Sequence, residues 1–190
     1  MATSEDPPPQ TPAGKVLWHF TMSLDGFVAG PDHDMDWMTG FDVRPGLLEE
    51  YVQTTGAVLC GRSGFDSAIG DARPYGGSWQ GAIFVLTHHP EDAPDTDGIT
   101  FLSCAVEEAV QIALDAAAGK NVEVFSPSIG RQLLDQGLMD EIDLHIAPVL
   151  LGKGIRLYDN PGGRPVRLHR VGEGGPTAAL SVRYRPVAGP

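Results

Sequence analysis

The order of short apolar runs along the chain limits the fold more than any other feature of the sequence. Runs suited to buried strands alternate with stretches of helical spacing, and two strand-like runs close the chain. Strands separated by helices favour parallel pairing, and hairpin-like strands favour antiparallel pairing. We therefore expect an α/β fold in three layers, with a mostly parallel central sheet, antiparallel C-terminal strands and helices on both faces.

The expected elements can be placed by residue range. The strands are expected at 16–22, 57–60, 83–87, 99–102, 122–125, 142–151, 167–171 and 178–187. The helices are expected at 45–55, 106–117 and 128–136. The helix at 106–117 has the clearest pattern, since Ser103 can cap its start and Gly119 can end it.

Length and composition support one globular domain. The chain has 190 residues, of which 42% are hydrophobic and 20% charged, which is enough for a single hydrophobic core. Residues 1–14 are rich in proline and carry little to bury. We expect this segment to be a flexible tail in front of one domain over residues 15–190.

The net charge of −12 limits the class of partner. An acidic surface repels nucleic acids and anionic membranes. Two cysteines without a CxxC pattern give no disulfide framework, and the acidic, proline-rich start lacks the features of a signal peptide. We therefore expect a cytoplasmic protein that acts on a small-molecule substrate.

The acidic loop at residues 32–36 does not fit a metal site. A calcium-binding EF-hand loop that began at Asp32 would need glycine at its sixth position and glutamate at its twelfth. Trp37 and Val43 stand there instead, so we expect a solvated acidic loop and no metal. Trp37 itself either pins this loop to the core or stacks on a flat ligand.

The familiar nucleotide-binding motifs are absent, because neither GxGxxG nor GxxxxGK[ST] occurs. Three expected strands are instead followed by polar loops, at 61–65, 87–89 and 126–131. Ligands of α/β sheets bind where the carboxyl ends of strands meet such loops. Arg62, His88 and Arg131 could therefore form one local anion site within the acidic surface.

Four segments together resemble the dihydrofolate-reductase-like family. They read MSLDGFVA at 22–29, LCGRSGF at 59–65, VLTHHP at 85–90, and GLMDEI running into PVLLGKG at 137–154. The resemblance is to the branch that holds the C-terminal reductase domain of the bifunctional riboflavin-biosynthesis deaminase-reductase. Members bind NADPH, often form dimers, and reduce a C=N or C=O bond in a small heterocyclic or sugar-like substrate. The resemblance therefore implies an NADPH-dependent reductase that forms a homodimer.

The resemblance also implies roles for individual residues. It assigns Gly61, Arg62 and Ser63 to the cofactor phosphates, and Thr87 with His88 to the adenosine ribose and its 2′-phosphate. Ala29 and the loop 150–154 would lie near the nicotinamide. Further cofactor-binding positions are Ser126, Ser128, Ile129, Gly130 and Arg131. The substrate side would be lined by Met22 and by three candidate catalytic residues, Asp25, Asp36 and Trp37.

One position departs from the family pattern. Members usually carry Gly-Gly where this chain has Ser126-Pro127, and glycine lets the backbone approach a pyrophosphate and donate to it. Proline lacks the N–H and fills that space. Ser126 and Pro127 are, however, a good N-cap and a good first residue for a helix. Both NADPH binding and its loss remain open.

Proton supply and overall function have alternatives as well. Hydride transfer leaves negative charge on the substrate, and Asp25 or Asp36 could supply the proton if burial raised its pKa. Asp25 could equally hold the Ser-Leu-Asp-Gly turn. The altered phosphate loop leaves room for a second function, a non-redox enzyme or ligand-binding protein on the same fold.

Overall fold

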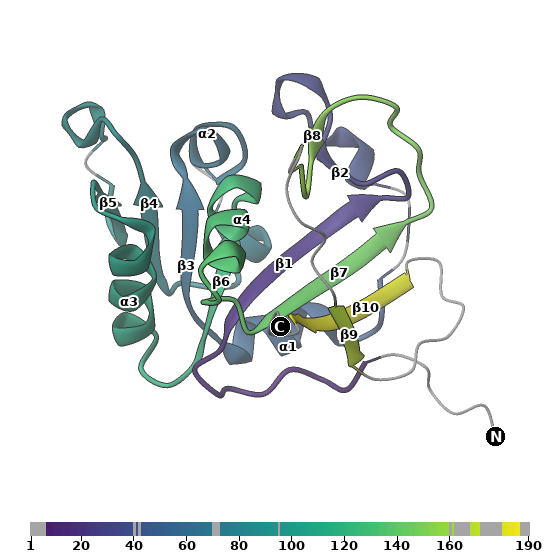
Figure 1. Ribbon diagram of the computed structural model, residues 1–190, viewed down its shortest axis with the longest axis horizontal. Coiled ribbons are helices and arrows are strands. Elements are labelled where there is room, and N and C mark those ends of the chain that lie inside the picture. Colours follow the sequence, from purple (N-terminus) through teal and green to yellow (C-terminus); the bar gives the residue numbers. More distant parts are fainter. Residues whose placement is uncertain are drawn as a thin grey trace.

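A central eight-stranded sheet organises the chain (Figure 1). The computed structural model describes residues 7–39, 41, 43–69, 73–94, 96–159, 161, 168–171 and 180–186. The strand order is β5 (Ile99–Leu102), β4 (Ala82–Leu86), β3 (Thr55–Gly61), β6 (Asn121–Phe125), β1 (Val16–Ser23), β7 (Glu141–Ala147), β10 (Leu180–Pro186) and β9 (Leu168–Val171). Every pairing is parallel except those of β10, which runs antiparallel to both of its neighbours.

Helices cover both faces of this sheet. The regular helices are α1 (Leu47–Thr54), α3 (Val106–Ala117) and α4 (Pro127–Asp135), with the single turn α2 (Arg62–Gly64). Shorter helical turns occur at Pro31–His33, Asp36–Met38, Phe65–Ile69, Pro74–Gly77 and Pro90–Asp92. In Figure 1, α3 and α4 lie across the near face. The ring of Tyr51 in α1 stacks on His19 of β1, which places α1 on the opposite face.

The two faces of the central strands differ in chemistry, because successive side chains of a strand point to opposite sides. The apolar face, under α3 and α4, carries Val122, Val124, Val16, Trp18, Ile142 and Leu144. The polar face, under α1, carries Glu123, His19, Glu141, Asp143 and His145, with Ser181 and Arg183 of β10. All of these polar side chains are buried.

The expected α/β fold is confirmed, with some differences in detail. The last strand of the parallel set, β7, ends at Ala147 and does not continue to Leu151. Ala105 precedes α3 as its N-cap without a side-chain hydrogen bond, so Ser103 does not cap it. Residues 167, 178–179 and 187 of the expected closing strands lie outside the described residues.

A second, two-stranded sheet was not expected from the sequence. The strands β2 (Phe27–Ala29) and β8 (Ile155–Arg156) pair antiparallel. Runs this short show no periodicity, so nothing in the sequence pattern marks them. The pairing brings the segment after β1 next to the segment after β7, beside the carboxyl ends of the parallel strands (Figure 1).

Part of the expected flexible tail contacts the sheet in the structure, at Pro8 and Gln10. Gln10 is 4% exposed, and its side chain donates to Glu141 at 3.2 Å and to Asp143 at 3.0 Å. Arg183 donates to the Pro8 carbonyl. Polar partners on the sheet therefore hold this segment, although it has little apolar surface to bury.

None of the helices within the described residues has the length and apolar character needed to cross a bilayer.

Candidate active site

A cleft of about 550 Å³ lies at the carboxyl ends of β1, β3 and β6. In the sheet, β6 lies between β3 and β1. The loops that follow β1 and β3 therefore lie on either side of the end of β6. Such a switch point is the preferred ligand site of open α/β sheets. The volume falls within the range of roughly 300–1,000 Å³ that is typical of small-molecule sites.

One end of the cleft is a cradle of small and hydroxyl residues from three loops. The lining residues here are Gly61, Ser63, Gly64, Ser126, Pro127 and Ser128. A Cβ at Gly61 would lie only 3.3 Å from the Ser126 hydroxyl oxygen. Glycine therefore keeps this part of the cleft open and leaves its backbone accessible to a ligand. The cradle fits a phosphate-bearing ligand, since hydroxyl and amide groups are the donors that bind phosphate oxygens.

The start of α4 has the capped structure that the sequence indicates. Ser126 is the N-cap and accepts a hydrogen bond from the Ile129 amide at 3.3 Å, and Pro127 occupies the first turn. The Ser126 and Ser128 hydroxyls lie 3.2 Å apart. Pro127 lines the cleft itself, so its ring occupies space on the ligand side of the helix start.

The remaining α4 residues of the expected cofactor set point elsewhere. Ile129 and Gly130 are buried, and any side chain at Gly130 would collide with the Trp18 ring. These residues therefore pack α4 on the sheet. Arg131 lines a second cavity of about 370 Å³, which it shares with Arg156 and Ser128. Ser128 lines both cavities, so Arg131 lies next to the cleft without facing it.

The cleft lining does not include Arg62, which was expected at the cofactor phosphates, or Thr87 and His88, which were expected at the adenosine ribose. Arg62 donates through Nε to both carboxylate oxygens of Asp66, at 2.8 and 2.9 Å, and through Nη2 to the Asp92 carbonyl at 3.3 Å. The hydrogen bond to Asp92 joins the loop after β3 to the loop after β4. Thr87 is buried and accepts a hydrogen bond from the His89 amide at 3.1 Å. His88 is exposed.

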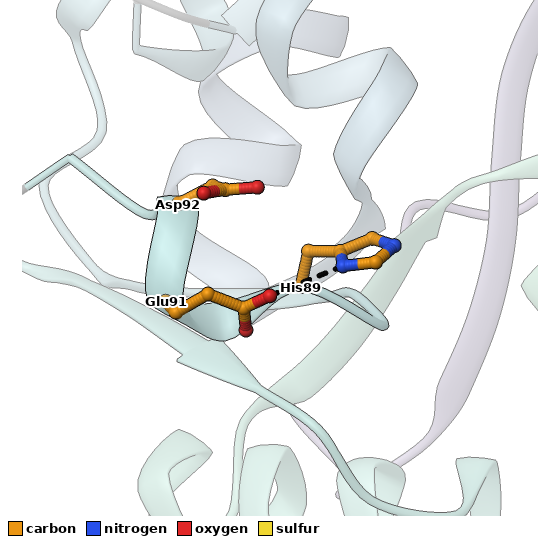
Figure 2. A group of neighbouring side chains, drawn as sticks. All are labelled: His89, Glu91 and Asp92. Carbon is orange, nitrogen blue, oxygen red and sulfur yellow. Dashed lines mark hydrogen bonds and ion pairs between the residues drawn. The ribbon is translucent and has the colours of Figure 1, made fainter.

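Next to these loops lies an exposed group of potential metal ligands, which Figure 2 shows. His89, Glu91 and Asp92 each place a ligand atom within 4.8 Å of the others. The imidazole Nδ1 of His89 lies 3.1 Å from Glu91. Each of the three side chains is exposed. The group is therefore part of a solvated surface turn.

Asp25 has a structural position. Its carboxylate accepts hydrogen bonds from Ser23 Oγ at 2.7 Å, from the Leu151 amide at 3.1 Å and from the Gly152 amide at 2.7 Å. The Ser23 hydroxyl and these amides lower the pKa of Asp25 to about 2. The condition for Asp25 as a proton donor, a pKa raised by burial, is therefore not met. Its role is to tie the turn after β1 to the loop at 150–154.

The loop between β2 and α1 reaches the cleft through residues other than those expected. Asp36 is exposed, and Trp37 is half-buried with an unpartnered indole nitrogen. Neither lines the cleft, whereas the neighbouring Met35 and Met38 do. Ala29 also lines the cleft, and its place near the nicotinamide stays a prediction.

The floor of the cleft holds a hydrogen-bonded cluster that the sequence analysis missed. We call it the polar floor: His19, Tyr51, Tyr75 and His145, which line the cleft, with Glu123 behind them. The His19 ring stacks on Tyr51 with centroids 3.9 Å apart. His19 Nδ1 lies 3.2 Å from Glu123 Oε2, and Tyr75 donates to the same carboxylate. The Tyr75 hydroxyl and His19 Nδ1 are 3.3 Å apart.

Burial sets the protonation of the polar floor. It lowers the pKa of His145 to about 3, with a further contribution from His19, so His145 is neutral near pH 7. With its hydrogen on Nδ1, His145 donates to Ser181 Oγ at 3.0 Å and accepts from His19 at Nε2, where the nitrogens are 3.1 Å apart. Burial also raises the pKa of Tyr51 and Tyr75 well above its ordinary value. Both phenols therefore remain donors.

Behind the polar floor, paired charges continue along the polar face. Arg183 donates to Asp143 at 2.9 and 2.7 Å, and Tyr51 donates to the same carboxylate at 2.6 Å. Burial alone would raise the pKa of Asp143, but the charge of Arg183 holds it below its ordinary value. Arg185 and Lys15 likewise pair with Glu141. The floor thus rests on fixed charges rather than on apolar packing.

The chain is similar in sequence and in fold to known proteins. The family model described as RibD C-terminal domain matches residues 14–177. An uncharacterized Bacillus subtilis protein, YwjB, is 25% identical over 148 residues, which cover 76% of this chain and 82% of that protein.

Solved structures show the same fold. A Shewanella sp. PV-4 protein named for riboflavin biosynthesis has a TM-score of 0.75 at 17% identity, over 92% of this chain and 99% of its own. The Thermotoga maritima deaminase and 5-amino-6-(5-phosphoribosylamino)uracil reductase has 0.69 at 17%, over 91% of this chain and 56% of its own. Enterococcus faecalis dihydrofolate reductase, solved with NADP(H), has 0.61 at 14%, over 91% of this chain and 96% of its own.

Proposed function

This chain belongs to the RibD C-terminal domain family, and from that premise we propose that it is an NADPH-dependent reductase. Its substrate is a small metabolite that carries a C=N or C=O bond. The observation that carries the proposal is one cleft with a phosphate-type cradle at one end and the polar floor beneath it. A reductase of this kind needs a nucleotide site and a proton source within one enclosed space.

The cradle would hold the cofactor phosphates. Gly61 and Gly64 allow close approach of the backbone, and the Ser63, Ser126 and Ser128 hydroxyls supply donors. Ala29 lines the same cleft from β2. A bound nicotinamide would supply the hydride, and its chemistry needs only correct placement against the substrate and exclusion of water.

Proton supply is assigned to the polar floor, in place of Asp25 and Asp36. Tyr75 faces the cleft as a neutral phenol, and its hydroxyl also lies 3.3 Å from His19 Nδ1. When Tyr75 turns its hydrogen toward negative charge that develops on the substrate, its oxygen can accept the hydrogen of His19. Glu123 contacts both groups and holds the Tyr75 hydroxyl and the His19 ring in place. The proton is thus held at the floor until the substrate requires it.

Calorimetric titration with NADPH and NADH tests the proposal. The wild-type protein is expected to bind NADPH, and Gly61→Val is expected to weaken binding by at least about tenfold, because the added side chain would meet Ser126 within the cradle. Gly137→Asn is the matched control, since Gly137 has a φ of +72° and open space around it. The absence of heat with both nucleotides would contradict the proposal.

The alternative, a non-redox enzyme or ligand-binding protein, is favoured by one observation. Pro127 lines the cleft and has no N–H to offer a phosphate. If this residue only hinders the cofactor, the double substitution Ser126→Gly, Pro127→Gly should tighten NADPH binding by about threefold to tenfold. It should also reduce stability by about 1 kcal/mol, chiefly because a flexible glycine replaces Pro127 in the first turn of α4. Unchanged or weaker binding would show that Ser126 and Pro127 are not the obstacle to the cofactor.

A further inference from the structure

The wall of the cleft opposite the cradle is apolar and reaches the solvent. Met35 and Met38 come from the loop after β2, Val43 from the segment before α1, and Leu47 and Leu48 from the first turn of α1. We call these five residues the apolar wall. Val43 is 46% exposed and Leu48 is 43% exposed. Exposed apolar side chains gathered around a cavity mark a surface that binds apolar groups.

The cleft offers only imidazoles as candidate cations for a charged substrate, from His19, His33 and His145 among the described lining residues. Among the described residues that line it, none is lysine or arginine. The nearest guanidinium to the apolar wall in sequence, Arg44, is paired with Glu50. The buried guanidinium behind the floor, Arg183, is paired with Asp143. An anion placed against the apolar wall would lose its hydration without a lysine or arginine to pair with, which is unfavourable.

The carboxylates behind the floor strengthen this exclusion. Glu123 is completely buried and contacts His19 and Tyr75, which line the cleft. Asp143 is also buried and contacts Tyr51, a third lining residue. The Glu123 carboxylate lies in a region of low dielectric, where its charge is weakly screened, whereas the charge of Asp143 is balanced by Arg183. A phosphate that approached the floor would meet this field directly.

We infer that the substrate is an uncharged molecule with an apolar ring or alkyl part that lies against the apolar wall, and that a phosphorylated sugar is excluded from this end of the cleft. The inference rests on the proposed function, since the cradle is reserved for the cofactor phosphates. It separates this chain from its Thermotoga neighbour, whose name specifies a phosphoribosyl substrate. Two methionines in the wall can adapt to rings of different shape.

A matched pair of fluorescent probes tests the inference. N-phenyl-1-naphthylamine is neutral, and 1-anilinonaphthalene-8-sulfonate is the same ring system with one negative charge. The neutral probe is expected to bind the wild-type protein at least about tenfold more tightly, because no described lining residue is a lysine or arginine that could pair with the charged probe. Ribose 5-phosphate at millimolar concentration is expected to leave the neutral probe bound.

A substitution at the mouth of the cleft locates the effect. Leu48→Lys places a cation on the apolar wall and should reduce the preference for the neutral probe by at least about threefold. Leu138→Lys is the matched control, because Leu138 is a similarly exposed leucine, at 37%, that does not line the cleft. This control should leave the preference unchanged.

Three results would overturn the inference: equal or tighter binding of the charged probe, displacement of the neutral probe by ribose 5-phosphate, or the same effect from Leu48→Lys and Leu138→Lys. The proposed function fails separately. If the neutral probe binds as expected while calorimetry finds no NADPH binding, the apolar site stands as that of a non-redox protein and the reductase proposal is rejected.

Discussion

The two faces of the central strands are stabilised in different ways. The apolar face under α3 and α4 is stabilised by packing, and each residue contributes according to the area that it buries. The polar face under α1 buries carboxylates, imidazoles and a guanidinium, and these groups are stable there only because they pair with one another. The cleft opens above the polar face. The polar face, whose buried charges need partners to be stable, is therefore also the face on which the candidate active site lies.

The sharpest test of this comparison uses two neighbouring residues of β7. Asp143→Asn changes little volume but takes the closest charged partner from the buried Arg183, which keeps only Glu50 and Glu141 at 3.7 Å, and should cost about 3 kcal/mol of unfolding free energy. Ile142→Val, on the apolar face, removes one methylene and should cost only about 0.5–1.5 kcal/mol. Urea denaturation of both variants measures the difference. Equal costs would show that the two faces do not differ in this way.

The pH dependence of stability should also come from the polar face. The pKa of His145 falls from 6.5 in the unfolded chain to about 3 in the fold, so below pH 6.5 the unfolded chain binds a proton that the fold rejects. The free energy of unfolding should therefore decrease as the pH is lowered, by up to about 1.4 kcal/mol per pH unit between these two pKa values. The depressed pKa of Asp143 adds further acid sensitivity at the lower end.

A substitution at His145 separates this contribution from the rest. In His145→Gln the slope of stability against pH should become shallower between pH 6.5 and about 3. In Ile142→Val, on the apolar face, the slope should equal that of the wild-type protein. Thermal unfolding followed by circular dichroism over a pH series gives both slopes. An unchanged slope in the His145 variant would remove this residue as the cause.

The smallest expected effect concerns the N-terminal segment that borders the polar face. Gln10→Ala removes two hydrogen bonds to Glu141 and Asp143 and should cost about 1–2 kcal/mol. Gln111→Ala removes an exposed hydrogen bond within α3 and should change stability by less than about 0.5 kcal/mol. If both variants behave alike in denaturation, the segment does not depend on the polar face.

Sequence alone was sufficient for the apolar side of the protein. The apolar steps of α3 and the short apolar strands predict a mostly parallel sheet, since local pattern and global fold agree there. Two of the four segments that resemble the family, at 22–29 and 59–65, contribute residues to the cleft lining. Gly61, Ser63 and Ser126 do lie together in it. Glycine and hydroxyl residues after strands are local signals, and they can be read without knowledge of the fold.

The polar floor could not be read in this way. Asp143 and His145 alternate with apolar residues in β7, a pattern that normally indicates a strand with one side in water. Their burial depends on α1, on the N-terminal segment and on Arg183, which is 40 residues from Asp143. Partners at such separations leave no local pattern. The one available signal was the repetition of polar residues at alternate positions in three strands that the fold brings together.

In the proposed function, the nucleotide occupies the cradle and the polar floor lies beneath its reacting end. A crystal structure of the protein grown with NADPH would show whether it does. We expect the cofactor phosphates within hydrogen-bond distance of the loops at Gly61–Ser63 and Ser126–Ser128, and the nicotinamide between Ala29 and the floor at His19. NADPH bound outside the cleft, or an empty cleft at saturating NADPH, would contradict this placement.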